Sequence, residues 1–76
     1  MADYYPLIVK AVTGLNAQDR HMLYQRGRDT LLAELRAVKP RLSERVIIDE
    51  RIAFEDAIRR AEAEMARRAQ DQEWPG

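Results

Sequence analysis

Few residues of this 76-residue chain belong to the types that carry catalysis. It contains one histidine, His21, one serine, Ser43, and no cysteine. A histidine that acts as a metal ligand needs companions, and the sequence has neither a second histidine nor the Glu-x-x-His spacing of di-iron helical bundles. Ser43 follows a turn and precedes a helical segment, so we expect it to cap a helix rather than act as a nucleophile. We therefore predict no catalytic residue, no cofactor and no bound metal.

The carboxylates of the C-terminal half are the other group with chemical potential. Glu55 and Glu62 are seven residues apart, which places them on one edge of a helix, where charged residues flank the seam of a coiled coil. In an antiparallel hairpin that turns near Pro40, Arg28 lies level with Glu55, because both arms rise equally per residue. We predict an Arg28–Glu55 contact, and ion pairing rather than metal binding by these carboxylates.

The middle of the chain is rich in basic residues, which raises the alternative of nucleic-acid binding. At ~100° per residue they do not form one stripe around a helix. The whole chain has 13 Lys+Arg and 13 Asp+Glu, so its formal net charge is zero, whereas phosphate binding needs a basic excess. We expect a solvated helix surface here, and a nucleic-acid-binding or regulatory protein that uses the Arg-rich second helix is the alternative. The residues are Arg20, Arg26, Arg28, Arg36, Lys39, Arg41 and Arg45.

The elements that position these side chains are helices. Apolar residues recur at helical spacing, no segment alternates as a strand does, and Ala, Leu, Arg and Glu dominate. The pattern predicts helices over about 4–13 and 17–38, and a third that continues to about residue 70. The third begins near Ser43, or at Asp49 if residues 46–48 form a separate turn. Asn16 is typical of an N-cap and Gly14 of a left-handed helix end.

These helices predict a single all-α domain over residues 1–70. A short N-terminal helix packs on a long antiparallel helical hairpin, because short connections favour antiparallel neighbours. Residues 71–76, which include Trp74, are expected to form a frayed tail. The first helix presents one apolar face. Its residues are Leu7, Ile8, Ala11, Val12 and Leu15.

Gly27 interrupts the second helix at the border of its apolar stripe. A glycine there costs ~1 kcal/mol relative to alanine, so a close contact must explain it. We expect the first helix or the Tyr5 ring to make that contact.

The hairpin tip carries more apolar side chains than one helix pair can bury. A second apolar surface of this kind is typical of self-association or of a protein partner. The alternative is that a bent hairpin, or the first helix folded back, covers it within the chain. Two tyrosines in the opening helix are further interface candidates, with packing on the hairpin as their alternative. The predicted interface residues are Leu32, Leu42, Val46, Ile48, Ile52, Tyr4 and Tyr5.

The block Asp3-Tyr4-Tyr5-Pro6-Leu7-Ile8 and the residues that follow it, Ala11, Val12, Gly14 and Leu15, resemble the start of a family of short uncharacterised bacterial helical proteins. The resemblance continues through residues 31–36, 42–44 and 57–59 and so covers most of the chain. It implies a helical fold and no particular activity, substrate or site.

The sequence therefore predicts a non-catalytic helical interaction module. It self-associates into a larger bundle as a homo-oligomer, or it serves as an accessory subunit of another protein. The N-terminus lacks the basic start and apolar run of a signal peptide, and the longest apolar runs are far shorter than the ~20 residues that cross a bilayer. We expect a cytoplasmic protein with protein partners and no membrane role.

Overall fold

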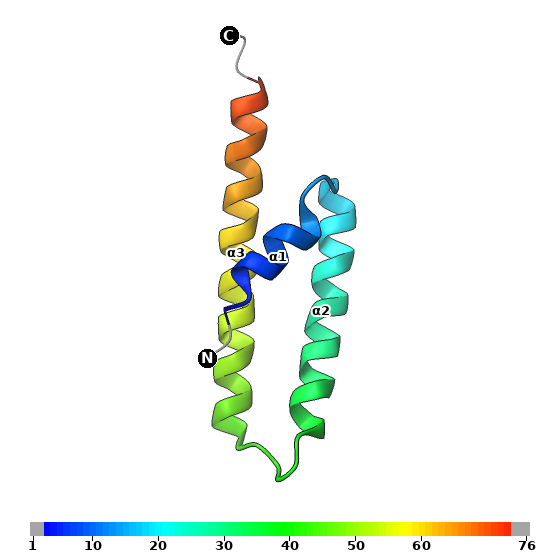
Figure 1. The fold of residues 1–76 in the computed structure, drawn as a ribbon, viewed down its shortest axis with the longest axis vertical. Helices are drawn as coiled ribbons and strands as arrows, with labels where there is room; N and C mark the ends of the chain where they lie inside the picture. Colours follow the sequence, from blue (N-terminus) through cyan, green and yellow to red (C-terminus); the bar gives the residue numbers. More distant parts are fainter. Residues whose placement is uncertain (1–2, 74–76) are drawn as a thin grey trace.

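The structure, a computed structural model that describes residues 3–73, consists of three α-helices (Figure 1). Helix α1 spans Tyr5–Val12, α2 spans Ala17–Ala37 and α3 spans Glu44–Glu73. The predicted all-α fold, a short first helix on a long hairpin, is confirmed. Helix α3 starts directly after Ser43, with no separate turn at residues 46–48, and continues three residues past the expected end at Gln70. The prediction for Trp74 and the rest of the tail lies outside the described residues.

Local chemistry sets the helix ends. The Asn16 Oδ1 atom accepts a hydrogen bond from the Asp19 N–H at 2.8 Å, and the Ser43 Oγ atom accepts one from the Val46 N–H at 3.2 Å. Both residues are therefore the N-caps that the sequence predicts. Gly14 follows α1 with φ +88°, a left-handed conformation that suits glycine.

Helix α1 crosses the hairpin obliquely, from the middle of α3 towards the beginning of α2, and α2 runs antiparallel to α3 (Figure 1). At one end the Tyr4 hydroxyl donates to Glu50 of α3, and at the other the Arg68 guanidinium donates to the Thr13 hydroxyl at 3.3 Å. The C-terminal part of α3 projects beyond both other helices, and the molecule measures 56 × 20 × 14 Å.

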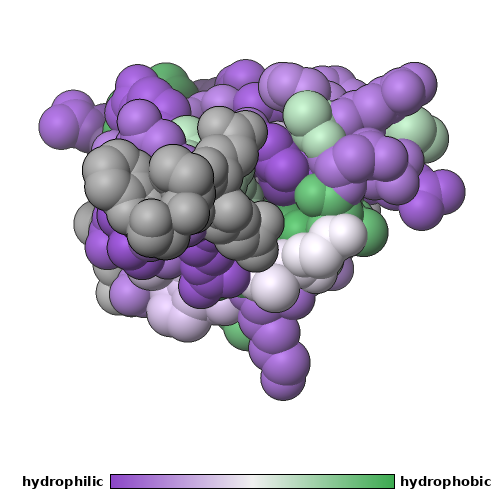
Figure 2. All heavy atoms as spheres, turned by 90° about the horizontal axis from the view of Figure 1, so that it is seen from above, coloured by the Kyte–Doolittle hydropathy of each residue, from purple (hydrophilic) through white to green (hydrophobic). Residues whose placement is uncertain are grey.

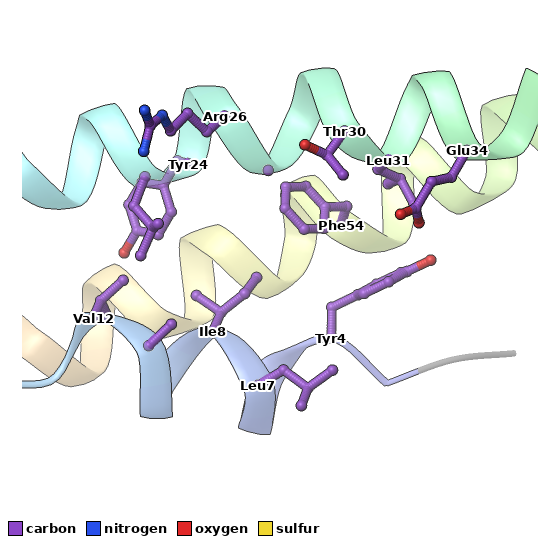
Figure 3. Close-up of a pocket in the computed structure, with 13 residues that line it drawn as sticks. Tyr4, Leu7, Ile8, Val12, Tyr24, Arg26, Thr30, Leu31, Glu34 and Phe54 are labelled. Atoms are coloured by element: carbon purple, nitrogen blue, oxygen red, sulfur yellow. The ribbon is translucent and has the colours of Figure 1, made fainter.

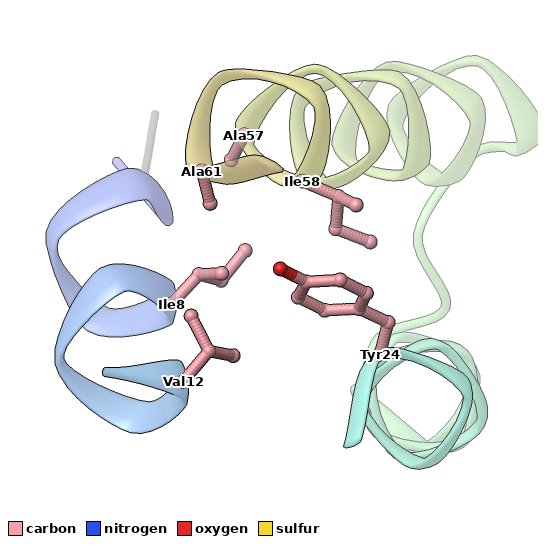
Figure 4. Close-up of a cluster of buried hydrophobic side chains, with 6 residues drawn as sticks. All are labelled: Ile8, Val12, Tyr24, Ala57, Ile58 and Ala61. Carbon is pink, nitrogen blue, oxygen red and sulfur yellow. The ribbon is translucent and has the colours of Figure 1, made fainter. Parts of the chain in front are cut away.

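A small core forms where the three helices meet (Figure 4). Ala57 and Ala61 of α3 are small enough to let α1 approach closely, and Val12 and Ala61 have no exposed surface. Tyr24 reaches this core from α2, level with Ile58 as the hairpin geometry predicts. The core cluster consists of Ile8, Val12, Tyr24, Ala57, Ile58 and Ala61.

Polar side chains cover most of the end of the molecule seen along its long axis, and hydrophobic side chains show in only a few places (Figure 2). Within residues 3–73, none of the three helices combines the length and apolar character that crossing a membrane requires.

Candidate functional site

A groove with mainly apolar walls lies between α1 and α2, and we call it the α1–α2 groove (Figure 3). It encloses about 390 Å³, and Phe54 of α3 lines it between the two helices. Apolar side chains predominate among the residues that line it. These are Tyr4, Leu7, Ile8, Ala11, Val12, Leu23, Tyr24, Arg26, Gly27, Thr30, Leu31, Glu34 and Phe54.

The floor of the groove depends on Gly27. A Cβ atom at this position would lie 2.8 Å from the Cζ atom of Phe54, so only glycine leaves room for the ring. The Tyr4 ring meets Phe54 edge-on, with centroids 5.3 Å apart and an interplanar angle of 77°. The expectation that the first helix or Tyr5 approaches Gly27 is therefore wrong, because the contact comes from α3.

Tyr4 closes one end of the groove and has a fixed hydroxyl. The hydroxyl donates to the Glu50 Oε2 atom at 2.5 Å. Burial, together with the hydrogen bond to Glu50 and the negative charges of Glu50 and Glu34, raises the pKa of Tyr4 to about 12. Tyr4 therefore stays protonated at neutral pH and acts as a rigid wall rather than as an acid or base.

The α2 wall carries two charges of opposite sign, Arg26 and Glu34. Both side chains are exposed, and neither forms an ion pair with another described side chain. Leu7 lies on the α1 side, at a level between them (Figure 3), and is 67% exposed. A large apolar side chain this open to water, beside a concave apolar surface, is the kind of feature that marks a binding site.

The apolar face predicted for the first helix is only partly buried, since Ile8 and Val12 are buried while Leu7 and Ala11 are exposed. The sequence held a signal for this difference. Leu7, Ile8 and Val9 are consecutive, and consecutive helical residues do not face the same neighbour. One of the three had to project away from the core.

Ion pairs hold α2 to α3 at the edge of the hairpin. The predicted Arg28–Glu55 contact is confirmed, with the Arg28 Nε atom 2.6 Å from the Glu55 Oε2 atom. The hydrogen bond from Arg28 holds the pKa of Glu55 below its usual range. Arg20 donates to Glu62 at 2.8 Å. Two cations of the Arg-rich helix are thus bound to carboxylates within the chain.

Glu62 also accepts a hydrogen bond from the Tyr24 hydroxyl at 2.6 Å. Burial alone would raise the pKa of Glu62, but the hydrogen bonds from Arg20 and Tyr24 outweigh it and the pKa lies below its usual range. Burial and the bond to Glu62 raise the pKa of Tyr24 to about 12. This cluster stabilises the ionised carboxylate and the neutral phenol, which is a structural arrangement.

The five apolar residues predicted at the hairpin tip do not form one surface. Ile48 and Ile52 line one hollow, at 46% and 58% exposed, and Leu32 lines an adjoining one. Leu42 lines a separate hollow. Val46 is two positions from Ile48, so it projects from another side of α3. Leu32, Ile48 and Ile52 together form what we call the tip patch.

The two tyrosines of the opening block are half-buried and pack against the core within the chain. Tyr4 contacts Phe54 and Glu50, as described above. The guanidinium carbon of Arg60 lies 4.3 Å from the centroid of the Tyr5 ring, in a cation–π contact.

The remaining residues with catalytic potential, His21 and Ser43, lie outside the α1–α2 groove. His21 is exposed, with its ring edge-on to Tyr24 and centroids 6.3 Å apart, and Ser43 caps α3. Within the part of the chain that the structure describes, no three His, Cys, Asp or Glu side chains gather as a metal ion requires. What the described surface offers a ligand is apolar area with charged edges.

Comparison of the chain with protein-family models, with curated proteins and with solved structures gives no match.

Proposed function

We propose that this protein is a non-catalytic helical interaction module and that the α1–α2 groove is its docking surface. The observation that carries the proposal is the groove itself, which is concave, apolar and bordered by the exposed side chain of Leu7. A helix with an apolar face is the usual occupant of such a groove. The partner is a protein, either a second copy of the chain or another protein that the chain serves as an accessory subunit.

The physical reason to expect a partner is the small core. A chain of this length buries only about 60% of the surface that its unfolded form exposes. Burial of further apolar surface contributes ~25 cal/mol per Å² before the costs of ordering, so a partner in the groove stabilises the fold as well as the complex. Charged residues at the border of the groove select the partner and its register.

The tip patch is the second apolar surface. We favour the groove because apolar side chains predominate in its lining, whereas charged side chains such as Arg51 and Glu55 make up much of the lining of the two hollows of the tip patch.

Nucleic-acid binding by the second helix is the weaker proposal. Arg20 and Arg28 already donate to carboxylates, and the net charge of zero gives no long-range attraction to phosphate. Action in a reducing compartment such as the cytoplasm belongs to the main proposal, and a chain without cysteine is compatible with it.

A photo-reactive amino acid placed at Leu7 tests the proposed function in cells that express the full chain. The matched control places the same group at Lys10, which is exposed on the same helix and does not line the groove. We expect a protein adduct from position 7 and none from position 10. The adduct should disappear when Thr30→Trp fills the groove from α2. Equal labelling at both positions, or no adduct at position 7, contradicts the proposal.

A further inference from the structure

We infer that the occupant of the α1–α2 groove is a second copy of this chain, bound about a two-fold axis that passes beside Thr30 with the two α2 helices antiparallel. The inference rests on the proposed function, because it names the partner for the same groove. The evidence for the second copy is the order of the charges along the α2 wall.

Three residues of the α2 wall form one row. Arg26, Thr30 and Glu34 follow one another at intervals of four, so they share one side of the helix, and all three line the groove. Arg26 and Glu34 are about 12 Å apart along the helix axis, too far for an ion pair with each other. Both are exposed and without an ion-pair partner among the described side chains. The row thus presents a positive end, a small neutral centre and a negative end.

Such a row is complementary to itself when it is reversed. A two-fold axis perpendicular to α2 at Thr30 brings each residue opposite the one equally far on the other side of position 30. Arg26 then faces Glu34 of the second copy, and the symmetry makes this pair twice. An axis parallel to α2 would instead bring each charge opposite its own kind. The charges therefore select the antiparallel arrangement over the parallel one.

Leu7 completes the argument from the α1 side. Along α2 it lies at a level between Arg26 and Glu34, on the wall of the groove opposite Thr30 (Figure 3). Helix α2 of the second copy, seated against this α2 and over the groove, covers Leu7 and the Phe54 floor. The same contact removes from water the most exposed of the large apolar side chains that the structure describes. A net charge of zero leaves no overall repulsion between copies.

Charge reversal tests the pairing. We expect Arg26→Glu and Glu34→Arg each to weaken self-association about tenfold, because each single reversal turns two attractive contacts into two repulsive ones. The double variant Arg26→Glu/Glu34→Arg should restore the affinity, since the two pairs re-form with their signs exchanged. Sedimentation equilibrium measures all four proteins, with helicity from circular dichroism as the folding control. Failure of the double variant to recover contradicts the charge pairing.

A single cysteine tests the axis independently. The chain has no cysteine of its own, so Thr30→Cys gives one thiol per copy, next to its counterpart across the axis. Gln18→Cys is the matched control, because Gln18 is exposed on the same helix and does not line the groove. We expect mild oxidation to convert Thr30→Cys into covalent dimer at least about tenfold faster than the control. This factor corresponds to the two thiols being held together rather than meeting by collision.

Two results separate this inference from the proposed function. A purified chain that stays monomeric at every concentration, with no excess disulfide at position 30, overturns the second-copy assignment. If the photo-reactive group at Leu7 still labels a different protein at the groove in cells, the interaction module stands and only its partner was assigned wrongly. If position 7 labels nothing, both proposals fail.

Discussion

At Gly27, the absence of a side chain decides the shape of the α1–α2 groove. The Phe54 ring occupies the space that a Cβ atom would take, and the ring is held from its other side by Tyr4. Glycine destabilises a helix at an interior position, and the packing of the Phe54 ring against Gly27 offsets this loss of stability. The groove floor is thus a consequence of three residues from three different parts of the sequence.

Gly27→Ala should destabilise the protein. Overpacking against the Phe54 ring costs about 1–3 kcal/mol, which outweighs the ~1 kcal/mol that alanine gains in helix propensity. In a Phe54→Leu background the ring is gone, so the same substitution at Gly27 should become stabilising. Urea unfolding of the four proteins measures both effects. If Gly27→Ala stabilises the wild-type chain, the ring contact is not what requires glycine.

Acid should weaken the Glu62 cluster. A carboxyl whose pKa is lowered by folding contributes stability above its unfolded pKa of about 4.3, and that stability is lost as the pH falls through the folded value. Glu62→Gln should therefore cost about 1 kcal/mol at pH 7 and less at pH 3, allowing for partial exposure of the pair. Urea unfolding at the two pH values gives the comparison. A cost that is equal at both values would show that ionisation of Glu62 is not involved.

Contacts between residues were predictable where they follow from the register of two regular helices. The Arg28–Glu55 pair needed only the position of the turn and the rise per residue. The approach of Phe54 to Gly27 was not predictable in this way. It depends on the distance between the helix axes, which the packed side chains set together.

Among the elements, α1 depends most on its surroundings. Its eight residues are too few to be helical alone in water, so its structure comes from packing on α3. Hydrogen bonds at Tyr4 and Thr13 fix its two ends against α3. Its C-terminal end was predictable from Gly14, which acts through local backbone conformation. The side that it exposes was not, because the direction in which α1 crosses the hairpin decides between Leu7 and Ile8.

The tip patch makes a prediction at the scale of one element. Ile48→Glu with Ile52→Glu should leave helicity and self-association unchanged, because both side chains are exposed on α3 and lie outside the groove. The matched control is Ile47→Glu, which places a charge where the side chain is 4% exposed and should unfold the tip. Circular dichroism and sedimentation measure the two properties. Loss of self-association in the folded double variant would move the interface from the groove to the tip patch.

As a whole, the molecule is long and thin for its length. Its radius of gyration is 14.9 Å, against about 11 Å for a compact domain of this size. The all-α fold was predictable because helical periodicity, caps and short connections agree along the chain. The groove was not, since a concave surface arises from the relative placement of three helices rather than from any one segment. An elongated chain with a small core and an apolar groove buries more of its apolar surface in an assembly than it does alone.

The molar mass in solution tests this account most directly. Light scattering after size exclusion, over a series of concentrations, compares the wild-type chain with Leu7→Glu, whose side chain is open enough to leave the fold intact. We predict that the wild-type chain reaches twice its single-chain mass of 8.9 kDa as the concentration rises, and that Leu7→Glu keeps the mass of one chain. A wild-type chain that stays at one mass throughout, or a Leu7→Glu variant that dimerises as well as the wild type, would contradict it.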